Sequence, residues 1–166
     1  VLAQTVHTSL SKEYRAPFYR IYSSIALTDS IVGGESYFMA EIKSLKRILD
    51  AASCGGRKVL CFVDEVLRGT NTKERIAAGY AVLKDLAGKG VLCFAATHDV
   101  ELTGLLQDEY TNMHFGEELA GDDIMFSYRI AEGKATSTNA ILLLERFGFG
   151  ESIIRDAKNM IGGKNE

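Results

Sequence analysis

The feature that most constrains the fold is an apolar run that ends in two adjacent carboxylates. Residues 59–65 read Val-Leu-Cys-Phe-Val-Asp-Glu. A continuous apolar run of this length is typical of a strand that is covered on both faces of a parallel sheet, and we predict such a strand over residues 58–63. Ligands bind at the carboxyl ends of parallel strands. Asp64 and Glu65 would therefore stand where a ligand binds.

An acid pair in that position suits chemistry on the terminal phosphates of a nucleotide. We assign Asp64 to a magnesium ion, held through its water shell. Glu65 would orient or deprotonate the attacking water. Two solvated acids at the end of a strand remain the alternative. No Gly-x-x-x-x-Gly-Lys-Ser/Thr loop precedes the pair, so the usual phosphate cradle is missing from this sequence.

Strand and helix patterns alternate along the chain and predict an α/β sheet joined by right-handed parallel crossovers. In the first long helix, apolar residues recur at spacings of three and four; they are Phe38, Ile42, Leu45, Leu49 and Ala52. The expected strands are 18–25, 58–63 and 91–96, the last also buried. The expected helices are 36–52, from Asn71 to 86, and a short one ending at Leu106. A hairpin over 110–117 and 123–131, turning at Gly121-Asp122, precedes two short helices over 138–146 and 151–161.

His98 follows the third strand pattern, in Ala-Thr-His. If the two apolar strands are neighbours, His98 lies near Asp64 and Glu65. A neutral imidazole there can hydrogen-bond a γ-phosphate and report its presence. A structural histidine at a strand end is the alternative interpretation.

Two polar segments stand at helix entries. Residues 68–72 read Arg-Gly-Thr-Asn-Thr, a loop that could contact a partner subunit or a phosphate. Asn71 with Glu74 also resembles a capping box, so a capped helix entry explains the same residues. Gly33-Gly34-Glu35-Ser36 precedes the first long helix and makes a possible anion site, which is weak evidence alone.

Bulk properties exclude some functions for this segment. Its 166 residues suit one domain, and its net charge of −3 gives no electrostatic footprint for nucleic acid. The three cysteines, Cys54, Cys61 and Cys93, show no Cys-x-x-Cys spacing. Cys61 and Cys93 are expected in the core, and a reduced, cytoplasmic location fits them. No stretch is long and apolar enough to cross a bilayer, so no membrane contact is expected. Because Val1 is not a natural start, we expect a part of a longer protein.

The ordered motifs resemble the ATPase domain of the MutS family, within the wider ABC-type ATPases. They are Gly-Gly-Glu-Ser-Tyr-Phe-Met-Ala-Glu over 33–41, the strand ending in Asp-Glu, the Arg-Gly-Thr-Asn-Thr loop, and Ala-Thr-His. The resemblance runs from about Leu2 to Ile161. It implies that residues 1–166 form a partial MutS-type ATPase domain. The implied fold is a P-loop NTPase-like sheet with flanking helices that lacks the Walker A strand, loop and helix.

The resemblance also implies roles for individual residues. Asp64 and Glu65 match the Walker B pair, with Asp64 on the metal, and His98 matches the switch histidine. Ser36 matches the signature serine, which reaches the γ-phosphate bound by the opposite subunit. The remaining implied nucleotide contacts are Gly34, Arg68, Thr70 and Asn71. The implied cofactors are ATP and Mg²⁺.

The function that follows from the resemblance is ATP binding and hydrolysis in a MutS-like DNA-binding protein. ATP would be sandwiched between this chain and a second copy, and DNA would be bound by domains outside this chain. Without a Walker A loop, this segment alone is expected to be inactive. Leu67 stands where mismatch-repair members typically carry glycine, and Tyr37 where they carry a small residue. DNA mismatch repair and a related DNA-processing task therefore both stay open.

Two other hypotheses account for part of the sequence. One is a non-catalytic dimerisation or interaction module that keeps a vestigial ATPase fold. The other is a metal-dependent hydrolase built from Asp64, Glu65, His98 and Asp99. The second leaves the helix after Ser36 and the loop at Arg68 unexplained.

Overall fold

The computed structural model describes residues 1–25, 37–120, 123–135 and 140–162. The chain forms two compact units, residues 1–112 and residues 113–166. The assignment of all 166 residues to one domain stays a prediction.

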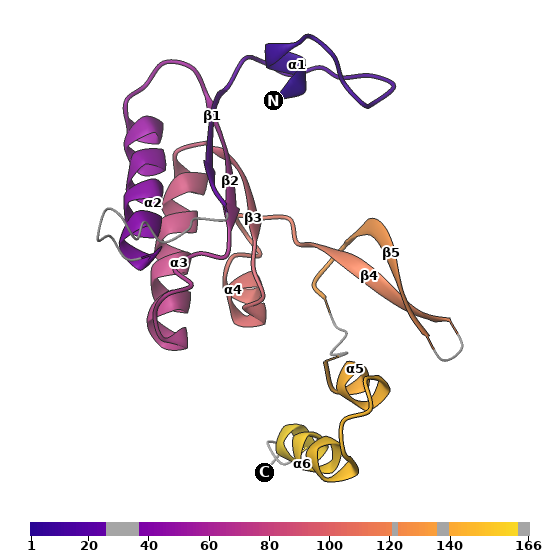
Figure 1. The fold of residues 1–166 in the computed structure, drawn as a ribbon. Helices are drawn as coiled ribbons and strands as arrows, with labels where there is room; N and C mark the ends of the chain where they lie inside the picture. The colour runs from indigo at the N-terminus through magenta and orange to yellow at the C-terminus, as the bar shows by residue number, and fades with distance from the viewer. Residues whose placement is uncertain (26–36, 121–122, 136–139, 163–166) are drawn as a thin grey trace. The chain divides into compact units, whose positions relative to one another are not determined.

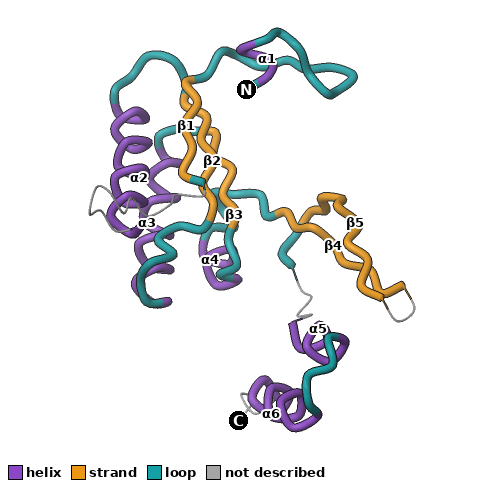
Figure 2. The backbone as a smooth tube through the Cα atoms, viewed as in Figure 1, coloured by secondary structure: helices purple, strands orange, loops and turns teal. Residues whose placement is uncertain are grey.

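The first unit is built on a parallel sheet of three strands. These are β1 (Arg20–Ser24), β2 (Val59–Asp64) and β3 (Leu92–Ala96), hydrogen-bonded in the order β1-β2-β3. Tyr22, Cys61 and Cys93 are register partners across the sheet. The strands therefore run side by side with their carboxyl ends at one edge (Figure 2). The predicted parallel pairing of the strands is confirmed. A short helix, α1 (Leu2–Thr5), precedes the sheet.

Three helices pack with this sheet (Figure 1). They are α2 (Tyr37–Ser53), α3 (Thr72–Gly88) and α4 (Val100–Leu105). Alternate residues of β2 face them, because successive side chains of a strand point to opposite sides. The buried core consists of Leu45, Ile48, Cys61, Val63, Val66, Leu67, Leu83, Leu86, Leu102 and Leu106. Cys61 lies in this core and Cys93 packs against it, as predicted, and all three cysteines are free.

The face of the sheet opposite this core is only partly covered by the described residues. Leu92 and Phe94 of β3 are 45% and 57% exposed, and the Phe94 ring stacks on Phe62 at 5.4 Å between centroids. The prediction of a buried third strand is therefore wrong for the described part of the chain. Among the described residues, β3 pairs with only one strand, β2. The outer side chains of β3 face no described helix.

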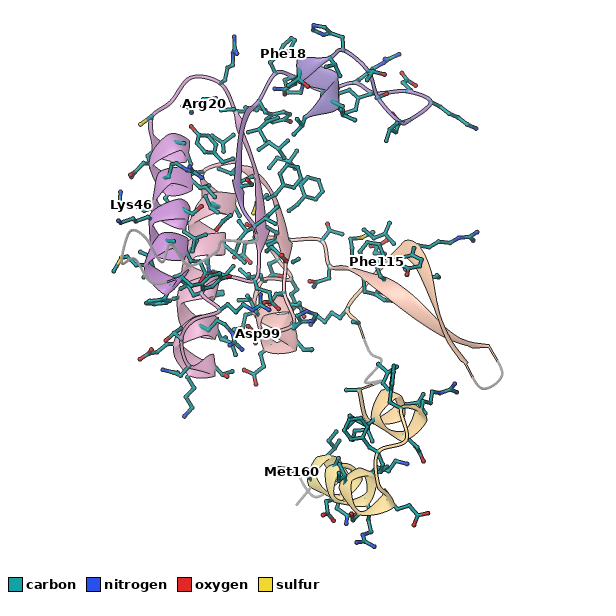
Figure 3. The ribbon with its side chains drawn as sticks, in the orientation of Figure 1. Phe18, Arg20, Lys46, Asp99, Phe115 and Met160 are labelled. Atoms are coloured by element: carbon teal, nitrogen blue, oxygen red, sulfur yellow. The ribbon has the colours of Figure 1, made fainter. Side chains whose placement is uncertain are left out.

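The helix α2 confirms the predicted period but shifts its buried face. Ile42, expected in the apolar stripe, is 37% exposed, whereas the polar residues Glu41 and Ser44 are buried. Ser44 donates from its hydroxyl to the carbonyl of Ser23 in β1. The carboxyl end of α2 is held from the sheet, because the Arg20 guanidinium, labelled in Figure 3, donates to the carbonyl of Ala51 at 2.7 Å.

The helix α3 begins as its sequence predicts. The Asn71 side chain accepts a hydrogen bond from the Glu74 amide at 3.1 Å and so caps the helix. The reciprocal half of a capping box is replaced by a bond from the Thr70 hydroxyl to the Glu74 carboxylate at 2.8 Å. Gly90, in the left-handed region at φ +67°, follows the end of the helix.

The second unit contains an antiparallel hairpin and two helices. The strands are β4 (Met113–Ala120) and β5 (Asp123–Glu132). The helices α5 (Ala140–Arg146) and α6 (Glu151–Gly162) contact each other, and Lys158 pairs with Glu145 at 3.1 Å. The predicted hairpin and closing helices are confirmed with small shifts in their bounds. The predicted turn at 121–122 lies outside the described residues.

The architecture is therefore α/β, with a three-stranded parallel sheet, flanking helices and a separate hairpin. This bears out the coarse fold prediction and is consistent with part of a P-loop ATPase domain. In the described part of the chain, every helix is too short or too polar to span a bilayer.

Candidate functional site

The site is built around the turn that follows β2. The Glu65 amide donates to the carbonyl of Ala96 at 3.0 Å and ties the turn to the end of β3. Glu65 and Leu67 have φ values of +52° and +57°. Residues with a Cβ rarely adopt this left-handed region of the backbone, so the turn is strained and must be held by its surroundings.

Glu41 of α2 holds this turn from beneath. Its Oε1 accepts hydrogen bonds from the amides of Leu67 at 2.5 Å and Arg68 at 3.3 Å. The residue is 2% exposed, and its second oxygen has no hydrogen-bond partner among the described residues. Burial raises the pKa of this carboxyl, and the two backbone hydrogen bonds oppose the rise.

The turn brings the predicted base and the predicted switch histidine together. Glu65 Oε1 lies 3.4 Å from His98 Nε2, and Glu65 Oε2 forms an ion pair with Arg68 Nε at 2.7 Å. The Glu65 side chain is only 22% exposed, whereas that of His98 is 94% exposed. Glu65 is therefore fixed in the wall of the site while His98 projects from its rim.

Asp64 is the last residue of β2 and is exposed. Its register partner in β3 is Ala96, two residues before His98, so it lies at the same edge of the sheet. A single carboxylate there fits magnesium, which keeps most of its water ligands and takes one or two protein carboxylates. No group of three or more metal-ligating side chains occurs among the described residues, which gives no support to the metal-dependent hydrolase.

A second acidic residue at this edge is tied to a cation. Asp99, labelled in Figure 3, accepts two hydrogen bonds from the Arg75 guanidinium, at 2.8 Å from Nε and 2.7 Å from Nη2. Arg75 lies in the first turn of α3. These bonds hold the pKa of Asp99 below its ordinary value. The pair therefore links the start of α3 to the segment that carries His98.

These groups line one pocket of about 200 Å³. It lies between the turn after β2, the first turn of α3 and the segment after β3. Its lining consists of Glu65, Val66, Arg68, Arg75, Thr97, His98 and Asp99.

The Arg68–Thr72 loop is held by local contacts. The side chains of Thr70 and Asn71 both hydrogen-bond to Glu74 in the first turn of α3. A Cβ on Gly69 would lie 2.9 Å from Phe38 Cβ, so only glycine lets the loop approach α2 so closely. A contact of Arg68, Thr70 or Asn71 with a nucleotide stays a prediction. Ser36 and Gly34 lie outside the described residues.

Sequence reasoning missed the parts played by Glu41 and Arg75. Both carried a signal that is clear in retrospect. Glu41 is an acid within three to four residues of Phe38 and Leu45 on the core face of a helix, where a charge is costly unless it is bonded. Arg75 is a cation in the first helical turn, where the helix dipole disfavours it.

Comparison with known proteins points to one family. A family model described as MutS domain V matches residues 10–163. A DNA mismatch repair protein MutS of Natronomonas pharaonis is 33% identical over 88% of this chain and 17% of its own length. The corresponding protein of Lawsonia intracellularis is 34% identical over 84% of this chain and 16% of its own. A DNA mismatch repair protein MutS 2 of Haloarcula marismortui is 30% identical over 86% and 15%. The chain thus spans about a sixth of the length of the curated relatives it matches.

Proposed function

The chain belongs to the MutS domain V family, the ATPase domain of MutS, and from that membership we propose that it binds and hydrolyses ATP within a longer MutS-like DNA-binding protein. The observation that carries the proposal is the 3.4 Å approach of His98 to Glu65 at the carboxyl edge of the sheet, beside Asp64. Glu65 and His98 line one pocket, and Asp64 lies at the same edge of the sheet, which supports a shared role for the three residues.

In this proposal Glu65 activates the attacking water. Its carboxylate is held by Arg68 on one oxygen and faces His98 with the other. A carboxylate has about four lone-pair positions, so both oxygens can still accept a proton from a water in the pocket. The strained turn keeps this group aimed at the site, which reduces the reorganisation needed when the phosphate is attacked.

His98 would contact the γ-phosphate. Its exposed imidazole projects from the rim of the pocket, within reach of Glu65. A phosphate that binds His98 would therefore come close to the water held by Glu65. Asp64 would hold Mg²⁺ through its water shell, and the ion would neutralise charge on the phosphates. The P-loop, which this chain lacks, would come from another part of the longer protein.

The dimeric arrangement is also a proposal. Ser36 and Gly34 would reach the γ-phosphate bound by a second copy, and Arg68, Thr70 and Asn71 would lie near that interface. The relatives named as mismatch repair proteins favour mismatch repair or related DNA processing. The cytoplasm is the location that we propose. DNA would be bound by other domains, because this chain carries a net charge of −3.

The test compares ATP binding with ATP turnover in the longer protein that carries this segment. Equilibrium binding of ATP with Mg²⁺ and steady-state release of phosphate are measured on the same preparation. We expect ATP to bind and phosphate to be released in repeated turnovers. Binding without turnover would instead show a non-catalytic interaction module, and absence of both would contradict the ATPase assignment altogether.

A further inference from the structure

Arg75 occupies a position that local helix energetics do not favour. It lies four residues after the cap Asn71, in the first turn of α3, where the partial positive charge of the helix end repels a cation. Its guanidinium is nevertheless fixed by two hydrogen bonds to Asp99, and the two side chains are 24% and 16% exposed. A bidentate pair of this kind fixes direction as well as distance.

Asp99 does not use its side chain to cap its own helix, α4. It is the N-cap residue of α4, yet its side chain makes no capping hydrogen bond, although aspartate is among the best capping residues. Its carboxylate accepts from Arg75 instead, and its amide donates to the Thr97 hydroxyl at 3.0 Å. The helix α4 thus forgoes a side-chain cap, and α3 carries a cation in its first turn, for the contact between them.

His98 lies between the two residues that this contact fixes. Thr97 and Asp99 flank it, and the His98 side chain itself is 94% exposed. Packing of its own ring therefore does little to determine where the imidazole stands. Its place 3.4 Å from Glu65 must depend on the backbone on either side of it.

We propose that Arg75 is a positioning residue that acts through Asp99 to hold His98 at the spacing from Glu65 that hydrolysis requires. The inference rests on the proposed ATPase function and deepens it. Arg75 reaches from the helix that directly follows the Glu65 turn to the segment that carries His98. The ion pair thus adds a second tie between the Glu65 turn and the His98 segment, beside the bond from the Glu65 amide to the Ala96 carbonyl.

The kinetic test uses the longer protein with Arg75→Met, Asp99→Asn and Arg75→Lys. We expect Arg75→Met and Asp99→Asn each to lower kcat about tenfold or more, because small misplacements of catalytic groups are costly, with KM for ATP changed by less than about twofold. Arg75→Lys should recover part of the loss, since it keeps the charge but not the bidentate geometry. Lys46→Gln, which breaks an exposed ion pair with Asp50 on α2, is the matched control and should leave kcat unchanged.

A double-mutant cycle asks whether Arg75 acts through His98. If it does, Arg75→Met should slow the His98→Ala enzyme by less than about twofold, because the positioned group is already gone. Fully additive losses would overturn the inference. So would a protein whose turnover requires Glu65 but is indifferent to Arg75→Met, a result that leaves the proposed function standing.

Amide hydrogen exchange on this chain gives a readout that needs no activity. Arg75→Met should speed exchange in the segment 97–100 about tenfold or more, while β2 stays protected. Unchanged exchange in 97–100 would overturn the inference, because the pair would then not hold the segment. Absence of ATPase in the unmutated longer protein would instead be a failure of the proposed function, and the inference would fall with it.

Discussion

At the scale of single residues, Glu41 and Glu65 both interact with the turn after β2 but lie in opposite environments. Glu41 lies under it, buried and bonded to its backbone amides, whereas Glu65 lies in the pocket wall between Arg68 and His98. One carboxylate thus holds the backbone that aims the other. The roles proposed for Glu65, as the base, and for Asp64, as the metal ligand, remain proposals.

The buried carboxyl of Glu41 makes stability depend on pH. Its pKa is raised above the ordinary value of 4.5, so the folded chain binds this proton more tightly than the unfolded chain. The contribution to the free energy of unfolding is therefore complete below pH 4.5 and is lost as the pH rises through the raised pKa. Urea unfolding between pH 4.5 and 8 should show this decline.

Glu41→Gln keeps an oxygen for the Leu67 and Arg68 amides but does not ionise. We expect its stability relative to the unmutated chain to improve as the pH rises from 4.5 through the raised pKa of Glu41 and then to level off. Glu101→Gln, which changes an exposed carboxylate on α4, is the control for loss of a negative charge. Parallel pH profiles for the Glu41→Gln and unmutated chains would contradict the assignment of this carboxyl.

Leu67 illustrates what a residue-level resemblance can and cannot predict. Its departure from the glycine typical of mismatch-repair members was visible in the sequence. The consequence, a leucine at φ +57° that is nevertheless 8% exposed, was not, because the backbone angle depends on Glu41 and the strands around it. Burial of the leucine side chain offsets the strain that glycine would avoid.

At the scale of elements, the close approach of α2 to the loop at Gly69 can be tested by a pair of glycine variants. In Gly69→Ala the new Cβ would lie 2.9 Å from Phe38 Cβ, an atom next to the helix backbone that cannot easily move. We expect a loss of about 1–3 kcal/mol from overpacking, measured by urea unfolding.

Gly79→Ala is the matched comparison within α3. Its new Cβ would lie 3.4 Å from Leu102 Cδ2, an ordinary contact. Because alanine is favoured over glycine inside a helix, we expect a gain of about 0.5–1 kcal/mol. A Gly69→Ala variant that is as stable as the unmutated chain would contradict the close approach of the loop to α2.

Element prediction succeeded where local pattern decides and failed where neighbours decide. The cap at Asn71, the parallel strands and the hairpin all follow from residues close in the sequence. The exposure of Phe94 and the burial of Glu41 do not, since they depend on which elements cover a strand face and which backbone amides lie above a helix. The convergence of Glu65 and His98 was predictable because both follow neighbouring parallel strands. The Arg75–Asp99 pair was not, because its residues lie 24 positions apart and no sequence motif links them.

At the scale of the whole molecule, the proposal requires a second copy to complete the nucleotide site. Ser36→Ala in the longer protein should weaken ATP-driven dimerisation, because the hydroxyl would reach the γ-phosphate held by the other copy. Sedimentation with and without ATP measures the effect. Ser53→Ala, the same change at the last residue of α2, should dimerise normally, and an equal response of both variants would count against the role of Ser36.

The proposed hydrolysis depends most directly on Glu65, and single-turnover hydrolysis of ATP by the Glu65→Gln form of the longer protein tests the role of this residue. Glutamine keeps the shape of the side chain but cannot take a proton from water. We predict unchanged ATP affinity and a rate about 10²–10⁴-fold lower than that of the unmutated protein, with Glu101→Gln at the unmutated rate. A Glu65→Gln protein that hydrolyses ATP at the unmutated rate would contradict the account.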